Sequence, residues 1–475
     1  MKICLVLEGS YPFVRGGVSK WVEDMILSMP EHTFVIWAVG DKEEKRGKYL
    51  VEIPENVSHI QESFLDTALS QKIRKNRSIK LGSREKDAVE RLIRCQNPDL
   101  CVLLETFSEN AVNPIELFIS ENILDIIKNY SRDEYPFAGF ADLFWTVRSM
   151  FLPFLYLISQ EMPEADLYHS CSTGYAGALG AMASMKYQKP LVVTEHGIYT
   201  REREEEILRA DWVIPYFKEL WISMFYMFSR FAYDKAQQVT CLFQRASVIQ
   251  EDLGCMPEKI TVIGNGIHFK KYETIPDKEA ADWIDIGAIV RIAPIKDIKT
   301  MIYSFSQLKE QFKKVRLHIL GSVNDEEYHN ECLALIDYLE VEDIIFPGHV
   351  NIMEYMKKLD FTFLTSLSEG QPYAILESLA AGRPLVSTDV GSCRELIMGD
   401  ENDRFGPAGF CVTPMHQAEM LEALLLMCEN QKEREHMARA GRQRVKVFYN
   451  IEGMVQKYQE TYQKAVEKWQ ESVLN

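Results

Sequence analysis

Two glutamates in the second half of the chain are spaced in a way that could serve a hydroxyl-rich, anionic ligand. Glu369 and Glu377 lie in FTFLTSLSEGQPYAILESLAAGRPLVSTDVGS, which predicts a strand, a loop, a helix from about Tyr373 to Ala381 and a second strand. Carboxylates accept hydrogen bonds from sugar hydroxyls, and a helix start offers backbone N–H groups to phosphate. Glutamate pairs are common in an acidic chain, so the signal depends on the strand-loop-helix setting.

Two cations stand on an earlier strand-to-helix connection. The segment IGAIVRIAPIKDIKTMI places Arg291 and Lys296 where both can point at one site beyond the edge of a sheet. Fixed cations there suit a diphosphate whose negative charge grows as its bond to a sugar breaks. Taken alone, the two residues could equally be solvated surface cations.

The first half of the chain offers two further candidates. VVTEHGIYTRERE puts His196 at the carboxyl end of a predicted strand, where open α/β sheets expose residues that contact ligands. EGSYPFVRGGVSKWVEDMI places Gly16 and Gly17 before a predicted helix, where backbone N–H groups can approach an anion. The glycine spacing does not match G-x-G-x-x-G, so a tight turn is the plain alternative.

These residues need parallel sheets to position them, and the pattern of the chain predicts such sheets. Short apolar runs alternate with helical patterns throughout, as expected for an α/β fold. The predicted strands are ICLVLE, TFVIWAVG, LCVLLE, DLYHSC, PLVVTEHG and VTCLF in the first half, and ITVIGNGI, WIDIGAIVRI, RLHILGS, IIFPGH, FTFLTS, PLVSTD and GFCVTP in the second.

The polar stretch HFKKYETIPDKEAAD is the best place for a domain boundary, because apolar periodicity lapses there and a proline intervenes. We therefore expect domains at residues 1–270 and 271–450. Residues 451–475 predict a helix long enough to return to the first domain. The less regular segment 55–163 predicts a helical elaboration of that domain.

Composition excludes several classes of protein. The 475 residues carry a net charge of -17, which disfavours a broad nucleic-acid-binding surface. The ten cysteines form no C-x-x-C pair and are expected to be reduced thiols. The N-terminus reads as a core strand rather than a signal peptide, so we expect a cytoplasmic protein. The apolar stretches from Leu143 and Leu220 predict buried helices, with docking of a membrane-associated partner as the alternative.

Together the candidate segments resemble retaining glycosyltransferase family 4, and within it the Pel-type exopolysaccharide glycosyltransferases. The resemblance rests on EGSYPFVRGGVSKWV, TEHGIYTRERE, RIAPIKDIKT and SEGQPYAILES, which hold a Gly-Gly loop, an Arg-x4-Lys pair and a Glu-x7-Glu pair. It implies the GT-B architecture, with two facing Rossmann-like domains, parallel sheets and an active-site cleft between them. The first domain would bind the acceptor and the second the nucleotide-sugar donor.

The resemblance also implies residue roles. Arg291 and Lys296 would clamp the donor diphosphate, Glu377 would hold the ribose and Glu369 the sugar hydroxyls. His196 would lie near the reacting carbon. The remaining donor-binding positions implied by the resemblance are Gly16, Gly17, Gly370, Gln371, Pro372 and Tyr373. Pro372 departs from the Gly-rich family pattern and cannot donate a backbone N–H.

The implied reaction moves a hexose from a UDP-sugar, with UDP-glucose as first choice, to a growing exopolysaccharide. The departing diphosphate would take the acceptor proton, so no dedicated protein base is expected. No Asp-x-Asp occurs in the chain, and we expect transfer without a metal or another cofactor. A membrane-bound polysaccharide synthase is an expected partner. A nucleotide-sugar epimerase, a catalytically silent scaffold and a binding module for an unrelated ligand remain as alternatives.

Overall fold

The computed structural model describes residues 1–70, 79–279 and 281–474, which form two compact units. Unit 1 consists of Met1–Cys241, Ser247–Val262 and the chain from Tyr458 onward, and unit 2 consists of Leu242–Ala246 and Ile263–Lys457. The sequence places the main boundary after residue 270, whereas the chain enters unit 2 at Ile263. It re-enters unit 1 at Tyr458, where the sequence predicts a boundary at residue 451.

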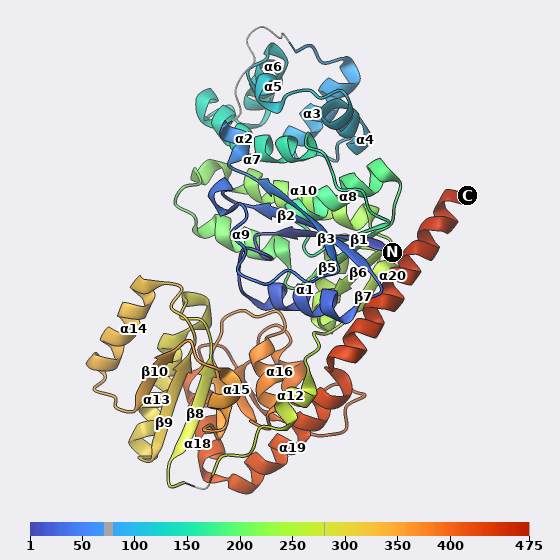
Figure 1. Cartoon of the computed structure of the whole chain (residues 1–475). Helices are drawn as coiled ribbons and strands as arrows, with labels where there is room; N and C mark the ends of the chain where they lie inside the picture. The colour runs from blue at the N-terminus through green and yellow to red at the C-terminus, as the bar shows by residue number, and fades with distance from the viewer. Residues whose placement is uncertain (71–78, 280, 475) are drawn as a thin grey trace. The chain divides into compact units, whose positions relative to one another are not determined.

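The sheet of unit 1 is parallel throughout and has the order β3-β2-β1-β4-β5-β6-β7 (Figure 1). This is the order of a doubly wound, Rossmann-like sheet, and it reverses between β1 and β4. The strands of this sheet are β1 (Lys2–Glu8), β2 (Thr33–Gly40), β3 (Val57–Phe64), β4 (Leu167–Ser170), β5 (Leu191–Glu195), β6 (Gln238–Cys241) and β7 (Ile260–Val262). Continuous apolar runs such as that of β1 are fully buried, as expected for central parallel strands.

The sheet of unit 2 is also parallel and has the order β10-β9-β8-β11-β12-β13, which reverses between β8 and β11. Its strands are β8 (Ile284–Ile289), β9 (Val315–Leu320), β10 (Ile344–Gly348), β11 (Phe361–Leu364), β12 (Leu385–Thr388) and β13 (Gly409–Val412). At such a reversal the connections leave neighbouring strands in opposite directions and open a crevice at their carboxyl ends. Each unit therefore has one such switch point.

Helices connect these strands. Before β8 they are α1 (Gly17–Ser28), α2 (Thr67–Ser70), α3 (Ser83–Ile93), α4 (Leu100–Leu104), α5 (Pro114–Phe118), α6 (Glu121–Glu134), α7 (Phe140–Ile158), α8 (Tyr175–Tyr187), α9 (Tyr199–Arg209), α10 (Lys218–Lys235), α11 (Gln244–Asp252) and α12 (Phe269–Glu273). After β8 they are α13 (Ile298–Gln311), α14 (Glu326–Tyr338), α15 (Ile352–Met356), α16 (Tyr373–Ala380), α17 (Cys393–Met398), α18 (Gln417–Glu429), α19 (Gln431–Phe448) and α20 (Ile451–Leu474).

Two expectations for segment 55–163 need correction. The run LCVLLE, predicted as a strand, forms α4, because the Asp99 side chain accepts hydrogen bonds from the N–H groups of Cys101 and Val102 and caps a helix. A short apolar run has no period that separates strand from helix. Residues 57–64 are not part of a helical elaboration but form the edge strand β3, whose half-exposed side chains give a weak sequence signal. The helices α3 to α7 gather beyond the sheet of unit 1 (Figure 1).

Helix α7 is the one helix in the described ranges that is long and apolar enough to cross a membrane, with a mean hydropathy of 1.3. In the structure 61% of that apolar window is buried. Val147, Phe151 and Leu155 follow one another at helical spacing, and all three lie in the hydrophobic core of unit 1. The helix therefore packs as a core element, as the sequence predicts.

The last helix, α20, is fixed to unit 1 by two buried tyrosines. The hydroxyl of Tyr462 lies 2.8 Å from Nδ1 of His169, and Nε2 of the same ring lies 2.7 Å from the hydroxyl of Thr194. The ring of Tyr458 packs against Trp21 of α1 at a centroid distance of 5.2 Å. Burial lowers the pKa of His169 to about 3, so this ring is neutral and needs both hydrogen bonds.

Candidate active site

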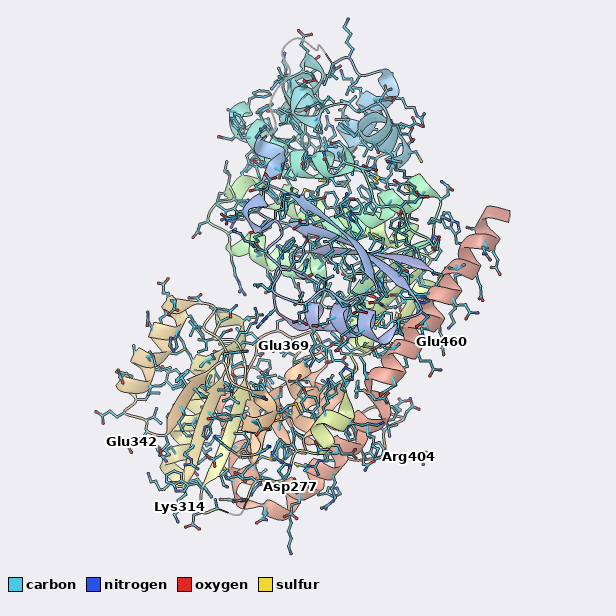
Figure 2. The ribbon with its side chains drawn as sticks, viewed as in Figure 1. Asp277, Lys314, Glu342, Glu369, Arg404 and Glu460 are labelled. Atoms are coloured by element: carbon cyan, nitrogen blue, oxygen red, sulfur yellow. The ribbon has the colours of Figure 1, made fainter. Side chains whose placement is uncertain are left out.

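The predicted donor residues of unit 2 lie on the two connections that leave its switch point. Arg291 and Lys296 follow β8, and Glu369 follows β11, the strand that pairs with β8. Glu369 and Lys314, which precedes β9, lie at opposite ends of unit 2 (Figure 2). The three candidates therefore share the carboxyl edge of the sheet, where ligands bind in this class of fold.

Hydrogen bonds hold the two connections together. The hydroxyl of Thr365 donates to the carbonyl oxygens of both Lys296 and Asp297, at 3.0 Å each. The backbone N–H of Leu367 donates to the carbonyl oxygen of Ile295 at 2.9 Å. Asp297 has a left-handed backbone (φ 47°), and its carboxylate caps α13 by accepting from the N–H of Thr300. The backbone that carries Lys296 is thus fixed on both sides.

Lys296 and Glu369 form an ion pair in this site. Nζ of Lys296 lies 2.5 Å from Oε1 of Glu369, and the hydroxyl of Ser366 donates to the same oxygen at 2.6 Å. Their side chains are 15% and 10% exposed, so both charges are largely desolvated. Arg291, by contrast, is exposed and forms no ion pair with the residues that the structure describes.

The loop that carries Glu369 packs against a second loop, formed around Gly391 and Ser392, for which the sequence predicts no role. The N–H of Ser392 donates to the carbonyl oxygen of Gly370 at 3.0 Å. Gly391 has φ +55°, and a Cβ atom added there would overlap the carbonyl oxygens of Glu369 and Gly370. Glycine is therefore required at position 391 for both its conformation and its close approach. The Gly-Ser pair that follows the predicted strand PLVSTD is the sequence feature from which this loop could have been recognised.

The side chain of Gln371 is hydrogen-bonded inside the protein and does not face a ligand. It is buried, and its Oε1 accepts a hydrogen bond from the backbone N–H of Asn265, while the Asn265 amide donates to the Gln371 carbonyl oxygen at 3.2 Å. Its Nε2 donates to the carbonyl oxygen of Leu242 at 3.4 Å. The side chain thus ties the donor loop to the segment where the chain enters unit 2, and a donor contact would have to come from its backbone.

The following helix starts where the sequence predicts. Pro372 is the N-cap of α16, with φ -74° and ψ 120°, and Tyr373 is its first residue. One turn later, Glu377 accepts a hydrogen bond from the hydroxyl of Tyr272 on α12 at 2.9 Å. Tyr272 was not predicted as a site residue, because nothing in the sequence relates it to a position 105 residues away. This tyrosine orients the carboxylate that is predicted to hold the ribose.

His196 belongs to the half of the predicted site that is built into unit 1. It directly follows β5, and its ring packs edge-on against Trp21 at a centroid distance of 4.8 Å. Its Nε2 is buried without a hydrogen-bond partner among the described residues. Burial lowers the pKa of His196 to about 4, so the ring is neutral at pH 7. A neutral imidazole can donate to or accept from a sugar hydroxyl but carries no charge for a phosphate.

The preceding residue, Glu195, holds the backbone around His196 in place through its buried carboxylate. Its carboxylate accepts hydrogen bonds from four donors: the hydroxyls of Thr173 and Tyr233, the Gln250 amide and the Tyr199 backbone N–H. Burial raises the pKa of Glu195, and these donors offset part of that effect. Because its oxygens are satisfied inside the protein, Glu195 positions His196 rather than facing a ligand.

A cavity of about 500 Å³ opens beside His196 at the switch point of unit 1. Its walls come from the carboxyl ends of β1 to β5 and from the starts of α1 and α9. The lining residues are Glu8, Gly9, Ser10, Val18, Val39, Gly40, Asp41, Leu65, Cys171, Ser172, His196, Gly197, Tyr199, Glu202 and Arg203. A cavity with hydroxyl, carboxylate and guanidinium groups fits a sugar better than an apolar ligand. Glu8 and Arg203 lie in the segments EGSYP and TEHGIYTRERE, but no sequence pattern distinguishes them as site residues.

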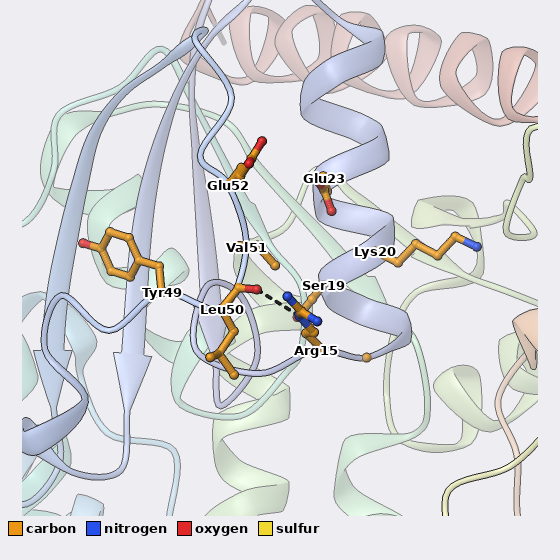
Figure 3. Close-up of a pocket in the computed structure, with 9 residues that line it drawn as sticks. Arg15, Ser19, Lys20, Glu23, Tyr49, Leu50, Val51 and Glu52 are labelled. Carbon is orange, nitrogen blue, oxygen red and sulfur yellow. Dashed lines mark hydrogen bonds between the residues drawn. The ribbon is translucent and has the colours of Figure 1, made fainter. Parts of the chain in front are cut away.

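The two glycines lie at the start of α1, as predicted. Gly16 is the N-cap and Gly17 the first helical residue. The backbone of Gly16 is extended, and no atom lies within 4 Å of where its Cβ would stand. A second cavity of about 590 Å³ opens here between α1 and residues 49–52, with Arg15 donating to the carbonyl oxygen of Leu50 at 3.0 Å (Figure 3). Neither the backbone conformation nor the packing explains why position 16 is a glycine.

Across residues 1–70, 79–279 and 281–474, the His, Cys, Asp and Glu side chains form no group of three or more that could hold a metal ion. All ten cysteines are free thiols. The positive charge that the site does offer comes from Arg291 and Lys296.

Two family models match the chain, one over each unit. Residues 1–258 match the family described as "Domain of unknown function (DUF3492)", and residues 273–444 match "Glycosyl transferases group 1". The chain belongs to the DUF3492 family, and its second half carries a match to the group 1 glycosyl transferases. The second match contains Arg291, Lys296, Glu369 and Glu377 and so covers the donor half of the predicted site.

Curated relatives share about a quarter of the residues of this chain over part of its length. The MMP alpha-(1->4)-mannosyltransferase of Mycolicibacterium hassiacum is 23% identical over 60% of this chain and 68% of its own. The alpha-monoglucosyldiacylglycerol synthase of Streptococcus pneumoniae is 26% identical over 53% of this chain and 57% of its own. The chain thus spans about two thirds or less of the length of these relatives.

A solved structure extends the likeness to the whole fold. HepE of Anabaena, crystallised in complex with UDP, has a TM-score of 0.62 and 16% identity, and the match covers 97% of this chain and 99% of that one. At this identity the similarity establishes the architecture. The GT-B fold predicted from the sequence, with two Rossmann-like parallel-sheet domains, is confirmed.

Proposed function

We propose that this glycosyltransferase moves a hexose from UDP-glucose or a related UDP-hexose onto a growing exopolysaccharide, with retention at the anomeric carbon and without a metal ion. The observation that carries the proposal is the ion pair of Lys296 with Glu369 beside the exposed Arg291, at the switch point of the unit 2 sheet. This arrangement provides two cations for a diphosphate and one carboxylate for a sugar.

The ion pair suggests how donor binding would proceed. A diphosphate carries more charge than a carboxylate and would draw Nζ of Lys296 away from Oε1 of Glu369. Glu369, still held by the hydroxyl of Ser366, would then accept hydrogen bonds from the sugar hydroxyls. As the glycosyl-phosphate bond breaks, Arg291 and Lys296 would stabilise the growing charge on the diphosphate.

The remaining roles follow from the resemblance described above. The departing diphosphate would take the proton of the acceptor hydroxyl, so the neutral His196 need not act as a base. It would hydrogen-bond the transferred sugar instead. Glu377 would hold the ribose in the orientation that Tyr272 supports.

The donor and acceptor are supported by different observations. The structures of HepE in complex with UDP and with UDP-glucose support a uridine nucleotide. The exopolysaccharide acceptor rests on the Pel-type segments around Gly16, His196 and Glu369. A cytoplasmic location and docking to a membrane-bound polysaccharide synthase stay predictions.

The test is a panel of nucleotide sugars in which release of nucleoside diphosphate is followed with and without an oligosaccharide acceptor. We expect release of UDP from UDP-glucose or a close relative, with sugar appearing on the acceptor. Conversion of the donor into its epimer without transfer would replace the proposal with an epimerase. Binding of UDP-sugars without any turnover would replace it with a silent scaffold.

A further inference from the structure

The charged residues that line the cavity beside His196 are mostly acidic, although the proposed reaction involves a negatively charged diphosphate. Three of its lining residues carry carboxyl groups, namely Glu8, Asp41 and Glu202, whereas Arg203 is its one permanently charged cation. Burial raises the pKa of Glu8 and of Glu202, so the cavity already disfavours negative charge. His196 is neutral at pH 7, because burial lowers its pKa.

The cation of the cavity is already engaged with an acidic neighbour. Nη1 of Arg203 lies 2.6 Å from Oε2 of Glu206, and the guanidinium stacks over the ring of Tyr199 at 5.2 Å. Asp41 pairs in turn with Lys45 at 2.7 Å. With these partners included, carboxylates still outnumber cations around the cavity. Both cations thus already have a carboxylate partner among the described residues.

The polar groups of the cavity are nevertheless arranged to hold a hydroxylated ligand. Glu8 accepts a hydrogen bond from the Tyr199 hydroxyl at 2.7 Å and from the Ala176 N–H at 3.2 Å, which fixes its carboxyl group at the end of β1. Nε of Arg203 is buried without a hydrogen-bond partner among the described residues. A fixed carboxyl group, a guanidinium and a neutral imidazole provide both acceptors and donors for sugar hydroxyls.

We infer that this cavity binds an acceptor sugar that carries no negative charge, and that it discriminates against uronic acids and phosphorylated sugars. The inference rests on the proposed function and specifies the acceptor class for it. An anionic group placed here would lose its hydration and would face an excess of carboxylates. A neutral sugar would lose only hydroxyl–water hydrogen bonds, which the cavity replaces.

The test compares two probes that differ only at one carbon, 4-nitrophenyl β-D-glucoside and 4-nitrophenyl β-D-glucuronide. Their affinities for the full chain are measured by ligand-observed NMR, in wild type and in two variants of α9. Glu202→Gln removes a carboxylate that lines the cavity. Glu205→Gln makes the same change three positions on, at a residue that is absent from the lining and pairs with Arg209.

We expect the glucoside to bind at least tenfold more tightly than the glucuronide in wild type. Glu202→Gln should reduce that ratio at least threefold, and Glu205→Gln should not change it. Equal or tighter binding of the glucuronide, an unchanged ratio in Glu202→Gln, or binding of neither probe would overturn the inference. The release of UDP from UDP-glucose is measured separately, so the cavity preference can hold where the proposed reaction fails, and the reverse.

Discussion

At the scale of single residues, the contact between Lys296 and Glu369 joins the predicted phosphate and sugar functions in one ion pair. Lys296→Ala removes a fixed cation from the developing diphosphate charge and should cost on the order of 3 kcal/mol of transition-state stabilisation, or roughly a hundredfold in kcat/KM. Glu369→Gln keeps the shape of the side chain and should chiefly lower kcat. Steady-state kinetics with the preferred nucleotide sugar measures both effects.

Lys299→Ala is the matched control for this prediction. Lys299 lies on α13 three positions after Lys296 and pairs with Glu331 at 2.8 Å, outside the site. Its loss should leave kcat/KM unchanged. A Lys296→Ala variant as active as Lys299→Ala would remove the assigned role of the lysine.

The lowered pKa of His196 predicts that the stability of unit 1 depends on pH. Burial holds the pKa of His196 at about 4, below the value near 6.5 of an unfolded chain. Its contribution is therefore fully present above pH 6.5 and is lost as the pH falls toward 4, by about 1.4 kcal/mol per pH unit. Denaturant unfolding at pH 7.5 and 5.5 should show a smaller acid loss in His196→Gln than in wild type. Equal losses would show that the ring is not buried in its neutral form.

The sequence pointed to the charged candidates, whose binding roles stay predictions, because residue type and spacing can be read directly along the chain. It could not indicate Tyr272 or Thr365, whose partners Glu377 and Lys296 are brought near only by the folded chain. It also predicted Gln371 as a donor-binding position, whereas its side chain accepts a hydrogen bond from the backbone N–H of Asn265. A buried amide and an exposed one look alike in a sequence.

At the scale of elements, the loop around Gly391 supports the loop of Glu369. Gly391→Ala places a methyl group onto the carbonyl oxygens of Glu369 and Gly370 in a backbone with φ +55°, so the supporting loop must move. We expect a loss of about 1–3 kcal/mol in unfolding free energy together with weaker donor binding. Thermal denaturation and nucleotide titration measure these two effects.

Gly348→Ala separates backbone strain from displacement of the donor loop. Gly348 also has a positive φ (+74°), but no atom lies within 4 Å of its Cβ position. This variant should lose some stability and keep its nucleotide affinity. If the two variants lowered nucleotide affinity equally, the support role of Gly391 would be wrong.

Two tyrosines of helix α20 should differ in how much stability their hydroxyl groups contribute. Tyr462→Phe removes the hydroxyl that lies 2.8 Å from Nδ1 of His169 and leaves that buried nitrogen unpaired, at a cost of about 1–3 kcal/mol. Tyr458→Phe should cost less, because its hydroxyl lies 3.5 Å from Thr194 and Thr240, at the limit of a hydrogen bond. Unfolding free energies in urea decide the order. The reverse order would contradict the anchoring role of Tyr462.

The elements themselves were predictable where apolar runs are long or flanked by clear turns. The central strands β1, β2, β8 and β11 were all predicted, because buried parallel strands read as continuous apolar runs. The failures were α4, a short apolar run decided by one capping aspartate, and β3, an edge strand with a weak pattern. Both depend on neighbours that a local pattern does not contain.

For the whole molecule, we propose that the fixed side chains of Arg291 and Lys296 take the place of a metal ion in sugar transfer. The most direct measurement is transfer from UDP-glucose to a glucoside acceptor in excess chelator, with the new linkage read by NMR. We expect undiminished UDP release and a product that keeps the α-configuration of the donor. Transfer abolished by chelator and restored by magnesium or manganese, or a product of inverted configuration, would contradict it.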